Sequence, residues 1–244
     1  MSKHNLKAVF FDLDETLIKN NIPIRALFPK VFFDFIDVIG EEHKLIFFNT
    51  LQNQVKGLWT GMFESKINPE QQLVNCFIKT LNKTGAVHPV KVPSLAKQMV
   101  AHFIDLAANN IELHDGAIET LEGLQQRDIS IGLITNGLVS IQSRKIASLN
   151  LEPYFDTITI SAEARAHKPD KPIFDLALKR SAVTADQAWF VGDHITNDIA
   201  GARRAGIHSI YYNPHKIDVE SSFAPVLERP DYTINSLTEI LEFL

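Results

Sequence analysis

The chain has 244 residues, enough to bury a sizeable core as one large domain or as a core with an insertion. Its formal net charge is −5 and it has no long basic run, which argues against nucleic acid or an anionic membrane as the main partner. The single cysteine, Cys76, excludes an internal disulfide. The sequence shows neither a signal-peptide pattern nor an apolar stretch long enough to span a bilayer, so we expect a cytoplasmic protein.

The first predicted element is a buried strand over residues 8–11, a short run rich in aromatic and β-branched side chains. Asp12 and Asp14 follow it directly. Like charges a few Å apart near a protein surface repel by roughly 4 kcal/mol at an effective dielectric constant of about 20. We therefore expect a small divalent cation here, with one carboxylate acting as a nucleophile.

Residues 18–109 show helical periodicity and almost no strand signal. Helices are predicted to begin near Pro23, Glu41, Asn68 and Pro93. The third start is the clearest, because Asn68 is a good N-cap, Pro69 suits the first helical position and Gln71 suits the third. The pattern predicts a helical bundle.

From Asp115 onward, helical segments alternate with short apolar runs. The strand-like runs cover residues 129–134, 155–160, 188–191 and 209–212, and Ser236 to Glu239 form a capping box for a last helix. Strands that alternate with helices of about ten residues imply a parallel sheet covered on both faces. The expected fold class is α/β: a doubly wound, Rossmann-like parallel sheet over 1–17 and 110–244, with an inserted α-helical bundle cap domain over 18–109.

Polar side chains also follow the later strand-like runs. They are Thr135 and Asn136, then Lys168, then Asp193 and Asp198. Because the carboxyl ends of parallel strands lie at one edge of a sheet, we expect these groups to converge with the two acids after the first run.

Taken in order, these clusters resemble the four motifs of the haloacid dehalogenase superfamily of phosphohydrolases. The residues concerned are Asp12-Leu13-Asp14-Glu15-Thr16, Thr135-Asn136, Lys168, and Gly192-Asp193 with Asp198. One such motif alone is weak evidence, but four in order, each at a strand end, are not. The Ile134 to Gly137 stretch and the size of the cap are similar to the branch of nucleotidases and sugar-phosphate phosphatases.

The resemblance implies a role for each residue. Asp12 would attack phosphorus and form an aspartyl-phosphate. Asp14 would protonate the leaving alcohol and later deprotonate water, and neighbouring carboxylates are expected to raise its pKa accordingly. Mg²⁺ would be held by Asp12, Asp193 and the backbone carbonyl of Asp14. The implied partner is a small phosphorylated metabolite.

The remaining motif residues are implied to bind the phosphate. Thr135, Asn136 and Lys168 would hold the transferring phosphoryl oxygens, and Asp198 would hold a metal-bound water or Lys168. The expected activity is Mg²⁺-dependent hydrolysis of a small phosphomonoester, either a nucleoside monophosphate or a sugar phosphate.

Several of these residues have a purely structural alternative. Asp12 could cap the following turn, although that leaves Asp14 unexplained. Thr135 and Asn136 could be turn formers before Gly137.

The later loops carry further alternatives. Lys171 competes with Lys168, but Pro172 resembles a first helical residue, which places Lys171 at the N-cap. Asp198 also stands where a helix N-terminus favours an acid. His194 is interpreted as a pocket wall or a solvated neighbour of the acids.

Two further features concern specificity. Trp59, Phe63 and Lys66 fall in a less regular part of the cap, where Trp59 either contacts the leaving group or packs in the bundle. Arg165 stands where relatives in the resembling family commonly carry glycine. Either the loop needs no positive φ there or its path differs, and Arg165 would offer a second cation near the pocket mouth.

Other functions on the same fold stay open. A phosphomutase shares the first half-reaction, and a non-catalytic binding protein would have lost a motif residue. A 2-haloacid dehalogenase needs neither a metal nor an acid for the leaving group, so Asp14 and Asp193 argue against it. The oligomeric state is likewise left open by the sequence.

Overall fold

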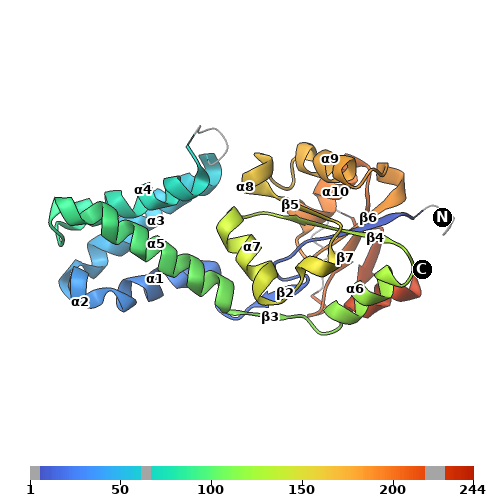
Figure 1. Cartoon of the computed structure of the whole chain (residues 1–244), viewed down its shortest axis with the longest axis horizontal. Coiled ribbons are helices and arrows are strands. Elements are labelled where there is room, and N and C mark those ends of the chain that lie inside the picture. Colours follow the sequence, from blue (N-terminus) through green and yellow to red (C-terminus); the bar gives the residue numbers. More distant parts are fainter. Residues whose placement is uncertain (1–5, 62–66, 218–228) are drawn as a thin grey trace. The chain divides into compact units, whose positions relative to one another are not determined.

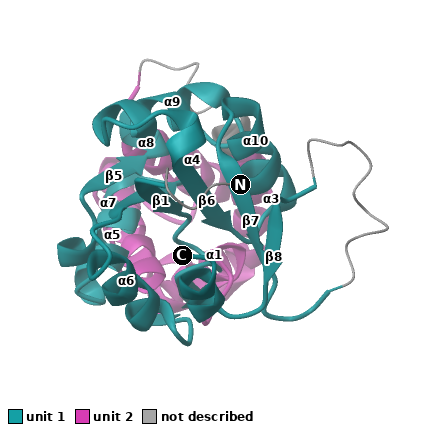
Figure 2. Cartoon of the chain, turned by 90° about the vertical axis from the view of Figure 1, so that its right-hand side faces the viewer, with its two compact units in different colours: residues 1–20, 111–244 teal, residues 21–110 magenta. Residues whose placement is uncertain are grey.

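The computed structural model describes residues 6–61, 67–217 and 229–244, with the side chains of 57–61 left aside. The chain forms two compact units (Figure 2). One consists of residues 1–20 and 111–244, and the other of residues 21–110. We call them the core unit and the helical unit.

The core unit is built on a six-stranded parallel sheet with the order β5-β4-β1-β6-β7-β8. The strands are β1 (Ala8–Phe11), β4 (Ser130–Thr135), β5 (Thr157–Ile160), β6 (Ala188–Gly192), β7 (His208–Tyr212) and β8 (Tyr232–Ile234). The chain runs outward from β1 to β4 and β5, then returns to β6 on the other side, so the switch point lies between β1 and β6. Ligands bind in the crevice beyond the carboxyl ends at such a point.

Helices cover both faces of this sheet (Figure 2). One face carries α6 (Ala117–Gln125), α7 (Val139–Ser148) and the 3₁₀ helix Leu237–Glu242, and the other carries α9 (Lys171–Arg180) and α10 (Gly201–Ala205). All four residues of β1 are fully buried, with Val9 and Phe11 in the first layer and Ala8 and Phe10 in the second. A strand buried on both faces needs apolar residues throughout. The predicted doubly wound α/β fold is confirmed.

The helical unit packs around aromatic side chains. Its helices are α1 (Ile24–Asp34), α2 (Ile36–Ile39), α3 (Lys44–Gly61), α4 (Pro69–Thr84) and α5 (Val92–Asn109), joined in part by 3₁₀ turns at Glu41–His43 and Pro89–Lys91. Figure 1 shows α4 beside α3 and α5. The rings of Phe28 and Phe103 stack at 4.6 Å, and those of Phe32 and Phe47 approach to 5.0 Å between centroids.

The predicted helix starts correspond to those observed, with one helix divided. The run from Pro23 to Gly40 forms two helices because Phe35 leaves helical geometry, with φ −115° and ψ 14°. Gly40, at φ +87°, ends the second one. The predicted cap at Asn68 is confirmed, since its Oδ1 accepts a hydrogen bond from the Glu70 N–H at 2.8 Å.

Several short elements were not predicted. They are the antiparallel pair β2 (Ile18–Asn20) and β3 (Ile111–Leu113), the strand β8 and the helix α8 (Ser161–Ala164). The three strands have only three residues each and α8 is a single helical turn, so none of them forms a continuous apolar run or shows a hydrophobic period. The capping box of the last helix is confirmed, but that helix is 3₁₀ in type. Within the described ranges, no helix is both long and apolar enough to cross a bilayer.

The Asn68 cap makes a stability prediction. Asn68→Ala leaves the Glu70 N–H of α4 without its side-chain acceptor, and we expect it to lower the free energy of unfolding by about 1 kcal/mol. Denaturant unfolding followed by circular dichroism measures this. Asn68→Asp keeps an acceptor and serves as the control. Equal stability of the alanine variant and the parent chain would show that the cap contributes nothing.

Candidate active site

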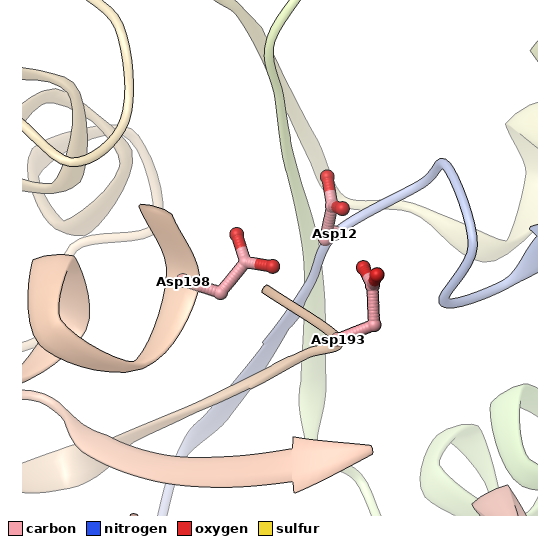
Figure 3. Close-up of side chains that lie close together, drawn as sticks. All are labelled: Asp12, Asp193 and Asp198. Carbon is pink, nitrogen blue, oxygen red and sulfur yellow. The ribbon is translucent and has the colours of Figure 1, made fainter. Parts of the chain in front are cut away.

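Three carboxylates meet at the switch point of the sheet (Figure 3). Asp12 follows β1, Asp193 follows β6, and Asp198 lies in the π-helix Ile195–Ala200. One oxygen of each lies within 4.8 Å of the others. These three residues are the acidic cluster.

The loop after β1 is a tight turn tied to the loop after β6. The Leu13 carbonyl accepts hydrogen bonds from the N–H groups of Leu17 and Ile18, both at 3.0 Å, and Glu15 adopts φ +62° in the turn. Thr16 is fully buried, and its hydroxyl donates to Asp193 Oδ1 at 3.1 Å. Thr16 thereby fixes the orientation of the Asp193 carboxylate relative to the first loop.

Lys168 is a buried cation at the centre of this arrangement. Its Nζ donates to Asp12 Oδ1 at 2.6 Å and to Asp198 Oδ1 at 2.7 Å. Asn136 holds the lysine from behind: its Nδ2 donates to the Lys168 carbonyl, and its Oδ1 accepts from the Lys168 N–H, both at 2.9 Å. The Asn136 amide is therefore engaged with the backbone of Lys168.

Lys171 has a different setting from Lys168. It is the first residue of α9, where Asp170 is the N-cap, so its predicted place at the N-cap is wrong by one position. Its exposed ammonium donates to Asp175 Oδ1 at 2.5 Å. The geometry therefore places Lys168 beside Asp12 and Lys171 on the outer surface.

The acidic cluster carries more negative charge than the described cation beside it balances. Burial raises the pKa of Asp12, and Asp198 and Asp193 add to this against the opposing Lys168 ammonium. Burial and then Asp198 raise the pKa of Asp193 to about 7. Burial alone would lower the pKa of Lys168, but Asp12 and Asp198 outweigh it and the pKa is raised.

These charges fit a divalent ion. Three carboxylates face one ammonium among the described groups, which leaves two negative charges when all three acids are ionised. Mg²⁺ prefers carboxylate and water oxygens in octahedral geometry and usually takes one or two protein carboxylates. The donor set of the acidic cluster is of this kind.

Asp14 faces a different environment from Asp12. Its carboxylate accepts hydrogen bonds from Lys145 Nζ, from Gln142 Nε2 at 2.8 Å and from Asn20 Nδ2 at 2.8 Å. Burial acts to raise its pKa, but the Lys145 charge and the three hydrogen-bond donors outweigh burial, and the pKa is lowered. The expectation that neighbouring carboxylates raise this pKa is wrong, because the side chains in contact with Asp14 are a cation and two amides.

Thr135 ends β4 with a buried hydroxyl. Its Oγ1 accepts a hydrogen bond from Gln142 Nε2 at 2.6 Å. A hydroxyl that accepts one bond retains its own proton as a donor. Thr135 can therefore donate to an anionic ligand while Gln142 holds its oxygen.

Sequence reasoning missed several residues that touch the predicted site. Gln142 and Lys145 lie on α7, and Asn20 ends β2. The sequence did contain a signal for Gln142 and Lys145. They lie three positions apart between Ile141 and Ile146, and apolar residues at this spacing mark the face of a helix that packs on a core. Lysine side chains are rarely buried, so residue type alone predicts an exposed side chain at position 145.

Other predicted positions have clear settings. Arg165 adopts φ +53°, so the alternative that the loop needs no positive φ there is wrong: the position has a positive φ, and arginine adopts it. His194 is exposed, and its Nδ1 accepts from the Asn197 N–H at 3.2 Å, which caps the π-helix. Trp59, Phe63 and Lys66 lie outside the residues whose side chains the structure describes.

Comparisons with known proteins identify similar hydrolases. The chain matches the model of the haloacid dehalogenase-like hydrolase family over residues 9–212. It is 29% identical over 191 residues to the pyrimidine 5'-nucleotidase PynA of Streptococcus pneumoniae, covering 78% of this chain and 76% of the relative. It is 24% identical over 253 aligned residues to the glyceraldehyde 3-phosphate phosphatase of Methanocaldococcus jannaschii, covering 98% and 97%. A solved 2-haloacid dehalogenase of Pseudomonas syringae superimposes with a TM-score of 0.75 and 25% identity, covering 98% of this chain and 97% of that chain.

The packing of Asp198 makes a second prediction. A Cβ at Gly192 would lie 2.5 Å from the side chain of Asp198, so Gly192→Ala must displace Asp198 from buried Lys168. We expect a loss of about 1–3 kcal/mol in the free energy of unfolding. Thermal or denaturant unfolding of the full chain measures it.

A matched control is available in α6. A Cβ at Gly123 would lie 2.6 Å from Leu241 Cδ1, the end of a flexible side chain. Gly123→Ala is therefore expected to change stability by less than about 1 kcal/mol. If both alanine variants lost the same stability, crowding of Asp198 would not be the cause.

Proposed function

The chain belongs to the haloacid dehalogenase-like hydrolase family, and from this we propose that it hydrolyses a small phosphomonoester through an aspartyl-phosphate on Asp12. The observation that carries the proposal is the acidic cluster around Lys168 at the switch point of the sheet. A carboxylate can approach a phosphate only where cations offset the charge of both groups.

Mg²⁺ is the proposed cofactor. Asp12, Asp193 and the backbone carbonyl of Asp14 would hold the ion, and Asp198 would orient Lys168 beside it. When bound, the ion supplies positive charge to the nucleophile and to the phosphate oxygens. The raised pKa values of Asp12 and Asp193 support this assignment, because crowded carboxylates favour a cation as much as a proton.

In the first step, an oxygen of Asp12 attacks phosphorus and the bond to the leaving alcohol breaks. Asp14 donates its proton to the leaving oxygen. Its pKa is low in the free protein, and the negative charge of an arriving phosphate would raise it. Lys168 and Thr135 would donate to the phosphoryl oxygens as charge redistributes among them.

In the second step, water attacks the phosphorus of the aspartyl-phosphate and the bond to Asp12 breaks. Asp14 accepts the proton that the water loses. The carboxylate form favoured by Lys145, Gln142 and Asn20 suits this step. Asn136 would act indirectly by holding the Lys168 backbone.

We assign the helical unit, residues 21–110, the role of a cap that selects the leaving group. A nucleoside monophosphate is the first candidate substrate and a sugar phosphate the second. The names of two relatives, a pyrimidine 5'-nucleotidase and a glyceraldehyde 3-phosphate phosphatase, support these two classes. Phosphate release from a panel of phosphorylated metabolites distinguishes them.

Replacement of the nucleophile tests the proposal. Asp12→Asn is expected to lower turnover of p-nitrophenyl phosphate by roughly 10³-fold or more, as removal of a catalytic nucleophile does. Its thermal stability should not fall, because one of the crowded acids becomes neutral and Lys168 keeps Asp198.

Two results would contradict the proposal. Full phosphatase activity of Asp12→Asn would exclude the aspartyl-phosphate. Release of chloride from 2-chloropropionate, without phosphatase activity, would favour the dehalogenase reaction named for the structural relative.

A separate prediction concerns how Mg²⁺ affinity changes with pH. The pKa of Asp193 is raised to about 7, so below that pH a proton occupies the carboxyl and Mg²⁺ must displace it. Mg²⁺ affinity should therefore fall as the pH falls, by up to about tenfold per pH unit for one released proton. Titration calorimetry at about pH 8 and about pH 5.5 measures this, and a chelator should abolish turnover. Asp193→Asn should weaken Mg²⁺ binding and make its pH dependence less steep, with Asp12 as the remaining titrating ligand. Equal affinity of the parent chain at both pH values would contradict the assignment.

A further inference from the structure

We infer that Lys145, assisted by Gln142, is a positioning residue that fixes the carboxylate of Asp14 toward the leaving group. The inference rests on the proposed function and extends it to α7, outside the four sequence motifs. It starts from the contacts of Asp14, since each of its two oxygens has a donor from this helix.

The spacing on α7 makes this possible. Residues three positions apart lie on the same face of a helix, one turn from each other. Lys145 Nζ donates to Asp14 Oδ1, and Gln142 Nε2 donates to Oδ2 at 2.8 Å. Two donors on different oxygens restrict rotation of the carboxylate about its terminal bond.

Asn20 closes the network from the other side. Its Nδ2 donates to Asp14 Oδ1 at 2.8 Å, and its Oδ1 accepts from Lys145 Nζ at 2.9 Å. The same Gln142 amide also reaches Thr135 Oγ1 at 2.6 Å. The proposed acid and the proposed phosphate ligand Thr135 therefore share one support.

Burial argues that this network serves more than stability. The Lys145 side chain is 2% exposed, and Gln142 is equally buried. Taking an ammonium out of water costs several kcal/mol, and apolar residues of similar volume often replace buried ion pairs without loss of stability. An apolar residue at 145 would match the neighbouring Ile141 and Ile146, so the lysine is explained by its partner Asp14 and not by the packing of α7.

The adjoining loop leaves room for Gln142. A Cβ at Gly137 would lie 2.9 Å from Gln142 Cγ and Cδ. Any larger residue at 137 would push Gln142 from its place between Asp14 and Thr135. The absence of a side chain at Gly137 is therefore explained by the space that Gln142 occupies in this network.

The test uses leaving groups that differ in their need for a proton. A primary alkyl phosphate requires protonation of its leaving oxygen, whereas p-nitrophenolate departs without it. For Lys145→Met we expect kcat/KM for the alkyl phosphate to fall by roughly 10–100-fold, because misplacement of a reacting group has effects of this size. For p-nitrophenyl phosphate the fall should stay below about threefold.

Three further variants sharpen the result. Asp14→Asn should show the same dependence on the leaving group, and Asp14→Asn with Lys145→Met should be no slower than Asp14→Asn alone. Lys145→Gln, which keeps a donor, should fall between the parent chain and Lys145→Met, and it provides a variant if the methionine protein fails to fold. Arg144→Met, which replaces an exposed cation next to Lys145, is the matched control and should leave both rates unchanged.

The outcomes separate this inference from the proposed function. Equal losses for both substrates, or an additional loss in the double variant, would overturn the positioning role while Asp12→Asn still abolishes turnover. Full activity of Asp12→Asn would instead overturn the proposed function, and the positioning role with it. A selective loss for the alkyl phosphate, absent from the double variant, supports the inference.

Discussion

Repulsion among the carboxylates of the acidic cluster is the constraint on which the site depends. Asp12 follows β1 and both Asp193 and Asp198 follow β6, and these two strands are neighbours in the sheet. Lys168 offsets part of the carboxylates' charge from a buried position. The remaining charge calls for a cation, and a phosphate ester can be bound where such a cation lies.

Two aspartates two residues apart have opposite electrostatic settings. Asp12 lies among acids and has a raised pKa, whereas Asp14 lies among donors from α7 and β2 and has a lowered one. Glu15, directly after Asp14, turns the chain with a positive φ. Opposite settings are the pattern expected where two carboxyl groups perform different tasks on one substrate.

The sheet could be predicted from the sequence because fully buried strands leave continuous apolar runs, as β1 does. The positions of Asp12 and Asp193 followed from their places directly after such runs, whereas that of Lys168 followed from the family motif that the chain resembles. The role of Lys145 could not be predicted, since burial of a lysine depends on a partner 131 positions away in the chain. For the same reason the pKa of Asp14 was expected in the wrong direction, and three-residue strands such as β2 carried too little pattern to detect.

Ile195–Ala200 is a π-helix, whose hydrogen bonds join residues five positions apart and not four as in an α-helix, so each turn contains roughly one more residue. Each residue of an α-helix turns the next side chain by about 100° around the axis. A deletion of one residue between Asp193 and Asp198 would therefore point the last acid away from Lys168, even though no acid had been removed. The length of this segment is as much a condition of the acidic cluster as the identity of its side chains.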